Sequence, residues 1–270
     1  MPNEELETLK AELERTRLAY RRAIQTGQLK AGFLARTSHE LRSPLNSLIG
    51  LHQLIMAGLC DNPEEEREFI EQAHQAAFRL LKLLDEIVYI AKLDYGAHEL
   101  DINAYPLSSI LQQVEQQIHL QAANRSYPLN MTQADSELCV KADFKRLVQV
   151  LISLLDAGVA KMQEGSITLK AQDAKEQNYV EILIEIHSPH LIWSEPLDKM
   201  QETLPEITPE QARTLIEQPV PSPEMNFILS QELLTSMQGQ LHLLVTPSDE
   251  VEFTRLQCLV PRAEAAEIQE

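Results

Sequence analysis

Apolar residues recur at alternating three- and four-residue steps through the first part of the chain, which is the spacing of one helix face. The pattern extends from residue 3 to about residue 58 and predicts one long helix or two abutting helices. Pro44 lies inside this pattern, and we expect it to bend the helix without necessarily ending it. The sequence GLCDNP at residues 58–63 predicts a turn.

A second helix with the same apolar spacing is predicted from Pro63 to Leu93, and Gly96 marks its end. Two amphipathic helices joined by a short turn make a helical hairpin, which cannot cover both apolar stripes alone. A homodimer would cover them by pairing two hairpins into a four-helix bundle. The expected seam residues are Leu34, Thr37 and Leu41 in the first helix, and Ile70, Ala73, Ala77, Leu80, Leu84, Ile87 and Ala91 in the second.

The pattern changes near residue 100 to short apolar runs separated by amphipathic segments. Helices are predicted at 107–123, 143–162 and 225–237, which favours an α+β sandwich with helices on one face of a mixed sheet. Residues 188–224 are polar and rich in proline, and they predict a long loop, with one short helix expected at 208–217. The expected strands are HELDI, YPLNMT, SELCVKA, GSITLKAQ, NYVEILIEIH, GQLHLLVT and FTRLQCLVP.

Composition narrows the function classes. The 270 residues favour about two domains, and 44% apolar residues suffice for a core. A net charge of −18, from 23 basic and 41 acidic residues, disfavours binding to nucleic acids and to anionic membranes. No apolar run approaches the roughly 18 residues needed to span a bilayer. The acidic N-terminus does not resemble a signal peptide, and three scattered cysteines fit a reducing compartment, so we expect a cytoplasmic protein.

The run FLARTSHELRSPLNSLIG at residues 33–50 resembles the phosphoacceptor box of sensor histidine kinases. The later runs LLKLLDEIVYIAKLDYGAHEL, DFKRLVQVLISLLDAGVAKM, LSQELLTSMQGQL and FTRLQCLVP are similar to that family's partner helix, the start of its ATP-binding domain, and its last helix and strands. The resemblance covers residues 25–262. It implies a dimerisation and phosphoacceptor domain at 25–98 and a degenerate ATP-binding-like domain at 99–262. The apolar spacing predicts a coiled-coil extension at 1–24, and residues 263–270 are expected to form a tail.

Four residues of the first run carry the chemistry that the resemblance implies. The expected seam leaves His39 on the outward face, where its Nε2 can meet a phosphoryl donor. The resemblance implies that Glu40 orients the imidazole and takes its Nδ1 proton, and Arg42 could neutralise a bound phosphoryl group. Ser43 stands where the family has a Thr or Asn that positions water to dephosphorylate a receiver. The alternative is a surface histidine on a solvated helix face.

The nucleotide-contact motifs of the family are missing. Its Asn-Leu-Leu-x-Asn-Ala-x-Lys pattern, whose asparagines hold Mg²⁺, has lost both asparagines, and no Asp-x-Gly-x-Gly follows the strand VEILIEI. No Gly-x-Gly-Leu opens the last helix. The resemblance therefore implies a domain that still folds but binds no ATP and no other cofactor, so that the receiver supplies Mg²⁺. The replaced positions are Ser153, Ala157, Ser188, His190, Glu224 and Asn226.

The leading hypothesis is a homodimeric phosphotransfer or adaptor protein of a two-component phosphorelay. His39 would accept a phosphoryl group from a receiver aspartate or from another histidine kinase and pass it to a second receiver. One alternative is an active histidine autokinase with a divergent nucleotide site. The other is a non-enzymatic scaffold or inhibitor that docks on a kinase or a receiver.

Two features of the loop region leave more than one interpretation. Trp193, with its apolar neighbours, could form an exposed interaction patch, or it could cap the nucleotide cleft from within. His187 and His190 have the spacing of two metal ligands but lack a third, so a loop is the simpler interpretation.

Overall fold

The computed structural model describes residues 17, 20, 32–124, 127–132, 138–162, 164–175, 178–193, 221–244 and 253–264. Its contacts divide into two units, residues 1–39 and 40–270, and each is described by itself. Most of the expected N-terminal extension and the expected short helix at 208–217 lie outside the described residues.

Residues 32–56, here called the first helix, are helical throughout. The helix passes through Pro44 without ending, as predicted, and the chain then turns at Gly58, which adopts a φ of 67°. Of the expected seam residues, Thr37 is buried and Leu34 is 63% exposed in the single chain. A heptad spacing identifies an apolar row, but it does not say what covers that row.

Helix α2 spans Pro63–Asp94, within one residue of the prediction. It begins because the side chain of Asn62 accepts a hydrogen bond from the main-chain N of Glu65, and because proline at the first position is already set for a helix. It ends where Gly96 adopts a φ of 65° and donates its N–H to the carbonyl of Leu93.

Helix α2 carries two apolar rows rather than one. Phe69 and Ala73 pack against Leu51 and Leu54 of the first helix. Of the predicted seam, Ala73 is covered by the first helix, whereas Ile70 and Leu84 belong to a row that the single chain leaves exposed. The buried residues of α2 are Phe69, Ala73, Ala76, Leu83 and Ile90, whereas Ile70 and Leu84 are 54% and 44% exposed.

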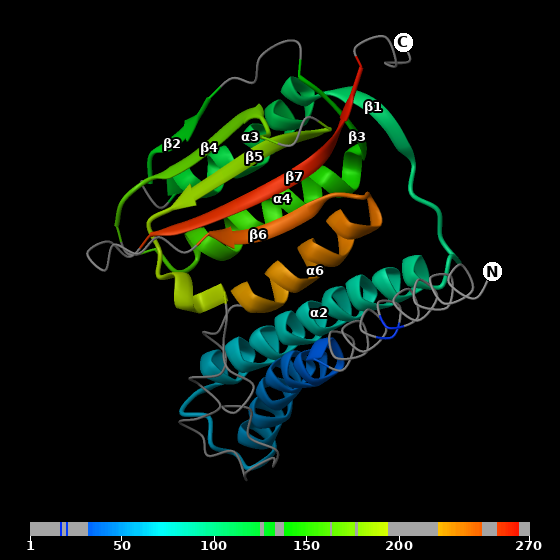
Figure 1. Ribbon diagram of the computed structural model, residues 1–270. Coiled ribbons are helices and arrows are strands. Elements are labelled where there is room, and N and C mark those ends of the chain that lie inside the picture. The colour runs from blue at the N-terminus through cyan, green and yellow to red at the C-terminus, as the bar shows by residue number, and fades with distance from the viewer. Residues whose placement is uncertain are drawn as a thin grey trace, which may run out of the picture. The chain divides into compact units, whose positions relative to one another are not determined.

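The C-terminal part contains a seven-stranded sheet of order β1-β3-β7-β5-β4-β2, with β6 also paired to β7 (Figure 1). Its pairs are antiparallel except for β2 with β4, so the sheet is mixed, as predicted. The first strand begins later than expected and shares only Ile102 with the run HELDI. The strands are β1 Ile102–Pro106, β2 Leu129–Met131, β3 Cys139–Asp143, β4 Ile167–Asp173, β5 Tyr179–Ile186, β6 Gln240–Leu244 and β7 Thr254–Ala263.

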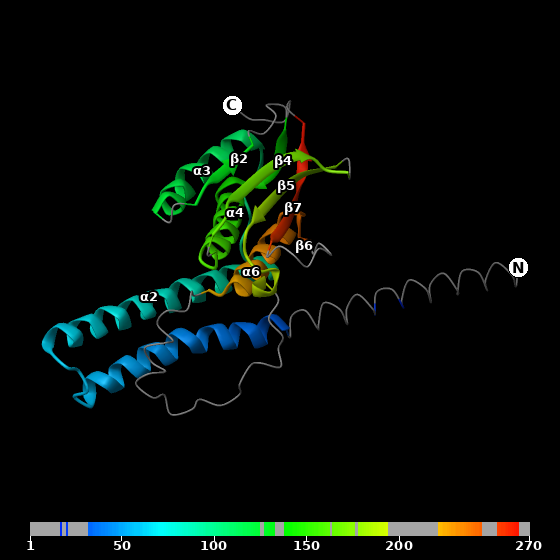
Figure 2. The same ribbon diagram turned by 90° about the vertical axis from the view of Figure 1, so that its left-hand side faces the viewer.

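Helices α3 (Leu107–Asn124), α4 (Phe144–Val159) and α6 (Pro223–Ser236) lie on one face of this sheet (Figures 1 and 2). A short 3-10 helix, η1, spans His190–Trp193. The core lies between sheet and helices, where Ile182 and Ile184 of β5 and Leu151 and Leu154 of α4 are fully buried. The expected α+β architecture, two long helices followed by an α/β sandwich, is confirmed.

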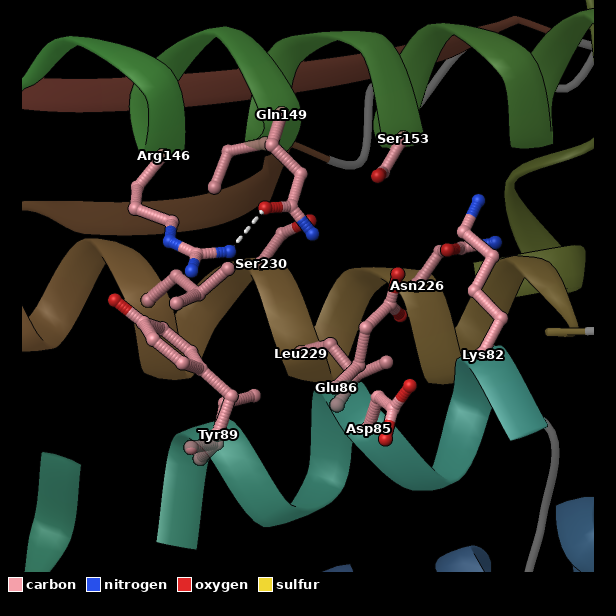
Figure 3. A pocket seen from close by; sticks show the side chains of 13 residues that line it. Lys82, Asp85, Glu86, Tyr89, Arg146, Gln149, Ser153, Asn226, Leu229 and Ser230 are labelled. Carbon is pink, nitrogen blue, oxygen red and sulfur yellow. Dashed lines mark hydrogen bonds between the residues drawn. The ribbon is translucent and has the colours of Figure 1, made fainter. Parts of the chain in front are cut away.

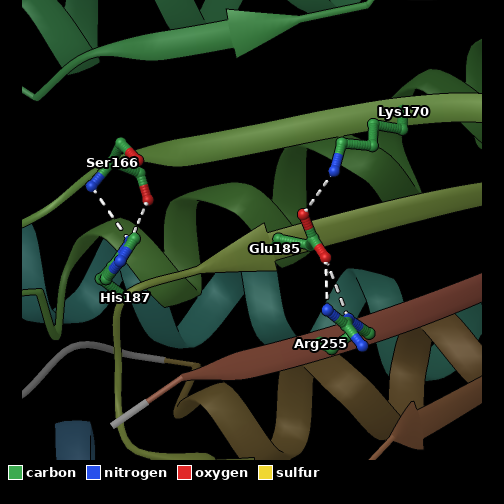
Figure 4. A network of polar contacts seen from close by, with 5 residues as sticks. All are labelled: Ser166, Lys170, Glu185, His187 and Arg255. Carbon is green, nitrogen blue, oxygen red and sulfur yellow. Dashed lines mark hydrogen bonds and ion pairs between the residues drawn. The ribbon is translucent and has the colours of Figure 1, made fainter. Parts of the chain in front are cut away.

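The opposite face of the sheet carries polar side chains that pair across the strands (Figure 4). Glu185 of β5 receives Lys170 of β4 at 2.9 Å and Arg255 of β7 at 2.7 Å. Burial raises the pKa of the Glu185 carboxyl, but the hydrogen bonds and charges of these two cations outweigh burial, so the net pKa is lowered. This network ties three strands together on the face opposite the described helices.

Candidate functional site

The residues of the expected phosphoacceptor box lie in the first helix. His39, Glu40, Arg42 and Ser43 are all partly buried, and His39 and Ser43 are one helical turn apart. The hydroxyl oxygen of Ser43 is buried and has no hydrogen-bond partner among the described residues. That hydroxyl therefore does not reach solvent in the single chain.

The carboxylate of Glu40 is bound to another part of the chain. Its Oε2 accepts a hydrogen bond from the main-chain N of Ser222 at 3.0 Å. Ser222 is the N-cap of α6, and its own hydroxyl accepts from the main-chain N of Met225 at 3.2 Å. The N-terminus of a helix attracts negative charge, so the contact is favourable in both charge and geometry.

The positions that the resemblance aligns with the nucleotide motifs lie on α4, after β5 and at the start of α6. Ser153 and Ala157 lie on the same face of α4, and Ala157 is buried. Ser188 and Glu224 are 1% and 6% exposed. Asn226 follows in the first turn of α6, where its side-chain nitrogen donates to the carbonyl of Pro221 at 3.1 Å. His190 is the first residue of η1.

Trp193 is buried, being only 2% exposed, so an exposed interaction patch at this residue was a wrong expectation. Its indole Nε1 donates to the hydroxyl of Thr254 at 3.2 Å, and that hydroxyl donates to the carbonyl of Ser188 at 2.8 Å. The indole also packs edge-on against Phe227 of α6. The indole therefore joins η1, the start of β7 and α6 in one buried contact.

The side chain of His187 contacts the main chain of Ser166. Its Nδ1 lies 2.9 Å from the carbonyl oxygen of Ser166 and 3.2 Å from the nitrogen of the same residue (Figure 4). Gly165 allows the approach, because a Cβ there would lie 2.5 Å from the His187 side chain. Within the described ranges, no group of three His, Cys, Asp or Glu side chains is placed to hold a metal ion.

A cavity of about 260 Å³ lies between α2, α4 and α6. In Figure 3, Gln149 and Ser153 extend into it from α4, Glu86 from α2 and Asn226 from α6. Two of the replaced nucleotide positions, Ser153 and Asn226, are thus brought together. The cavity is lined by Lys82, Asp85, Glu86, Tyr89, Ile90, Arg146, Gln149, Val150, Ser153, Asn226, Leu229, Ser230 and Leu233.

The charges in this cavity balance, with two acids and two bases among its lining residues. Burial raises the pKa of Glu86, although Lys82 and Arg146 oppose that shift. The Arg146 guanidinium lies 3.6 Å from the centre of the Tyr89 ring and donates to Gln149 at 2.8 Å. Sequence reasoning missed Tyr89 and Arg146 because no local pattern shows which face of α2 meets α4.

A second cavity of about 420 Å³ shares part of its lining with the first. Lys82, Glu86, Gln149 and Ser153 border both, so the two cavities adjoin along α4. The second one extends towards α3 and reaches Asp156, which is the acid that stands beside the replaced asparagine positions.

Among the described helices, none is long and apolar enough to cross a membrane.

Comparisons with known proteins agree with this architecture. The model of the His Kinase A (phospho-acceptor) domain matches residues 29–96. The sensor protein GacS of Pseudomonas syringae pv. syringae is 23% identical over 251 residues, which cover 92% of this chain and 27% of that protein. The autoinducer 2 sensor kinase/phosphatase LuxQ of Vibrio parahaemolyticus is 27% identical over 205 residues, which cover 74% of this chain and 23% of that protein.

The chain spans about a quarter of the length of these curated relatives. Among solved structures, the histidine kinase ThkA in complex with the response regulator protein TrrA superposes with a TM-score of 0.59, at 17% identity, over 88% of this chain and 64% of that chain. The Acinetobacter baumannii histidine kinase AdeS gives a TM-score of 0.58 at 15% identity, over 83% of this chain and 97% of that chain. At these identities the solved structures show a shared fold.

Proposed function

Since this chain belongs to the sensor histidine kinase family, we propose that it carries a phosphoryl group on His39 and exchanges it with the receiver aspartate of a response regulator. The imidazole nitrogen attacks the aspartyl phosphate in line, and a P–N bond forms as the P–O bond to the carboxylate breaks. Another histidine kinase is a second possible donor. The partner receiver holds the Mg²⁺ that neutralises the transferred group.

We also propose that the C-terminal domain does not bind ATP and Mg²⁺ in the family's manner. The observation that carries this proposal is the burial of Trp193 between Thr254 and Phe227, after the strand where the family reads adenine. The indole Nε1 and the Thr254 hydroxyl are hydrogen-bonded to each other there. On α4, Ala157 offers only a methyl group where the family has an Mg²⁺-binding amide.

A second copy of this chain is the partner that we propose for the hairpin. The exposed apolar row of α2 contains Ile70, Leu81, Leu84 and Val88, each between 42% and 54% exposed. These residues return to one side of the helix at three-, four- and eleven-residue steps. A row of this length is stabilised when an identical hairpin covers it in a four-helix bundle.

The decisive experiment mixes the purified chain with phosphorylated receiver domains. We expect acid-labile phosphate to appear on the unmodified chain and to be absent from the His39→Gln variant, because glutamine has no nucleophilic nitrogen. A titration with ATP and Mg²⁺, followed by labelling with radioactive ATP, is expected to show neither binding nor labelling.

The remaining outcomes separate the alternatives. Tight ATP binding with labelling of His39 would establish an autokinase with a divergent site. If the His39→Gln variant retained full signalling in cells, the chain would act as a scaffold or inhibitor that carries no phosphate.

A further inference from the structure

The N-terminus of α6 holds the Glu40 carboxylate of the first helix, the residue next to His39. We infer that this contact is a latch that regulates phosphotransfer: while it is closed, the Ser222 N–H withholds the Glu40 carboxylate from the imidazole. Ser222 is then a positioning residue that acts through Glu40. The inference rests on the proposed function of His39.

At the N-terminus of α6, the main-chain N–H of Ser222 takes no part in the hydrogen bonds within the helix. Pro223, the first residue of the helix, has no N–H, and the Met225 N–H is already bound to the Ser222 hydroxyl. The Asn226 N–H bonds to the Ser222 carbonyl within the helix. The Ser222 N–H lies outside the helical hydrogen bonds and donates to the Glu40 carboxylate.

A second carboxyl near the latch limits its strength, so that the latch can open. Glu224 places a second carboxyl in the same first turn, and it is nearly buried. Like charges near one helix terminus oppose each other, so Glu40 is held less tightly than a carboxylate at an otherwise neutral terminus. A contact with moderate free energy can open when a receiver or a phosphoryl group approaches His39.

A second, separate contact supports docking between the same parts of the chain. The Arg146 guanidinium of α4 stacks on Tyr89 of α2, and α2 also packs against α6 (Figure 3). Two helices of the C-terminal domain thus meet the hairpin at chemically different places. The Glu40–Ser222 hydrogen bond is a polar contact that reaches the phosphoacceptor box.

The family resemblance aligns the N-terminus of α6 with a phosphate-binding motif. It aligns residues 224–227 with the Gly-x-Gly-Leu motif that meets the triphosphate in the family. A carboxylate and a phosphate oxygen use the same main-chain donors. In this chain, the anion bound at that place comes from its own phosphoacceptor helix.

The latch itself is tested without any phosphotransfer. Amide hydrogen exchange at Ser222 is measured in the unmodified chain, in Glu40→Ala and in Gln53→Ala, an exposed residue of the same helix. We expect about tenfold faster exchange in Glu40→Ala, as for the loss of a charge-assisted hydrogen bond, and no change in Gln53→Ala. Equal exchange in Glu40→Ala and the unmodified chain would overturn the latch.

Its effect on chemistry is tested with a matched pair of variants. Ser222→Pro removes the N–H, and the φ of −60° at this residue suits proline. Ser222→Ala keeps the N–H and removes only the capping hydroxyl. We expect transfer to His39 from a phosphorylated receiver to be about tenfold faster in Ser222→Pro than in Ser222→Ala.

The two tests fail in different ways. An unchanged or slower rate in Ser222→Pro would overturn the regulatory role even if the hydrogen bond exists. If the unmodified chain and both Ser222 variants accepted no phosphate, the proposed function would fail, and the role of the latch would fall with it, while the exchange data would still decide whether the hydrogen bond forms.

Discussion

The hairpin and the C-terminal domain differ in how closely their residues match the family's motifs. The first helix keeps the His39–Glu40 pair and the residues around it on a partly exposed face. The C-terminal domain has a core in which Ile182 and Leu151 are fully buried, and we propose that Ala157 and Trp193 stand in place of the family's nucleotide contacts. Packing depends on inward faces and ligand binding on the ends of elements, so one can change while the other stays.

The two regions also differ in how their buried polar groups are satisfied. In the C-terminal domain, Ser188 and Thr254 bond to each other. In the hairpin, Ser43 and Ser47 have buried hydroxyls, and Arg79 a buried Nε, without a partner among the described residues. Each such group costs about 1–3 kcal/mol. Among the described residues, the hairpin therefore has more buried polar atoms without a hydrogen-bond partner than the C-terminal domain.

The strongest test of that difference is a charge on the exposed row of α2. We expect Leu84→Glu to convert the proposed dimer into a monomer, because it would place a carboxylate of each copy inside the apolar interface that we propose. Light scattering after size-exclusion chromatography measures the mass. Gln75→Glu, also exposed on α2, is the matched control and should leave the dimer intact; a dimeric Leu84→Glu would show that this row is not the interface.

The next effect concerns the indole in the C-terminal domain. Trp193→Ala is expected to lower the free energy of unfolding by about 3–5 kcal/mol, since it leaves a cavity and removes the donor to Thr254. Trp193→Phe keeps most of the volume and should cost about 1 kcal/mol. Denaturant titration followed by far-UV circular dichroism measures both. Tight ATP binding by the unmodified chain would contradict the role given to the indole.

The polar contacts across the sheet predict a smaller, pH-dependent effect on stability. The pKa of Glu185 is lowered in the folded chain, because Lys170 and Arg255 outweigh its burial. Its contribution is therefore present above the ordinary glutamate pKa and is lost as the pH falls through the lowered value. Glu185→Gln should reduce stability at pH 7 by about 1 kcal/mol or less and flatten the acid side of the stability profile. An unchanged profile would refute this assignment.

The smallest expected effect lies at the cavity between α2 and α4. The pKa of Glu86 is raised by burial, so its ionised form opposes folding, and the cost grows as the pH rises through the raised value. Glu86→Gln should therefore stabilise the chain at neutral pH, by less than about 1 kcal/mol. Thermal unfolding of both proteins at pH 7 and at pH 4 checks the sign, because the gain should disappear in acid.

The sequence predicted the elements well because their periodicity is local. The bounds of α2 and α3 agree within one residue, and the expected runs overlap β2 to β7. It did not distinguish the two apolar rows of α2, since both have helical spacing. Nor did it find Tyr89 against Arg146 or Trp193 against Thr254, because these pairs depend on tertiary placement across more than fifty residues.

The residues of the site were predicted from the sequence, but the contacts between them were not. The positions of Ser153 and Asn226 were identified as replaced motif residues, yet their meeting at one cavity follows only from how α4 crosses α6. The Glu40–Ser222 hydrogen bond joins residues 182 positions apart, and no local signal marks it.

Strand β7 pairs with β3, β5 and β6, although it is the last of the described strands in chain order. The hairpin can form on the ribosome as soon as α2 has emerged, whereas the sheet lacks this central strand until β7 has emerged. During translation the chain therefore passes through a stage in which the phosphoacceptor helix exists and its companion domain is still open. A nascent-chain folding assay would detect these as two separate events.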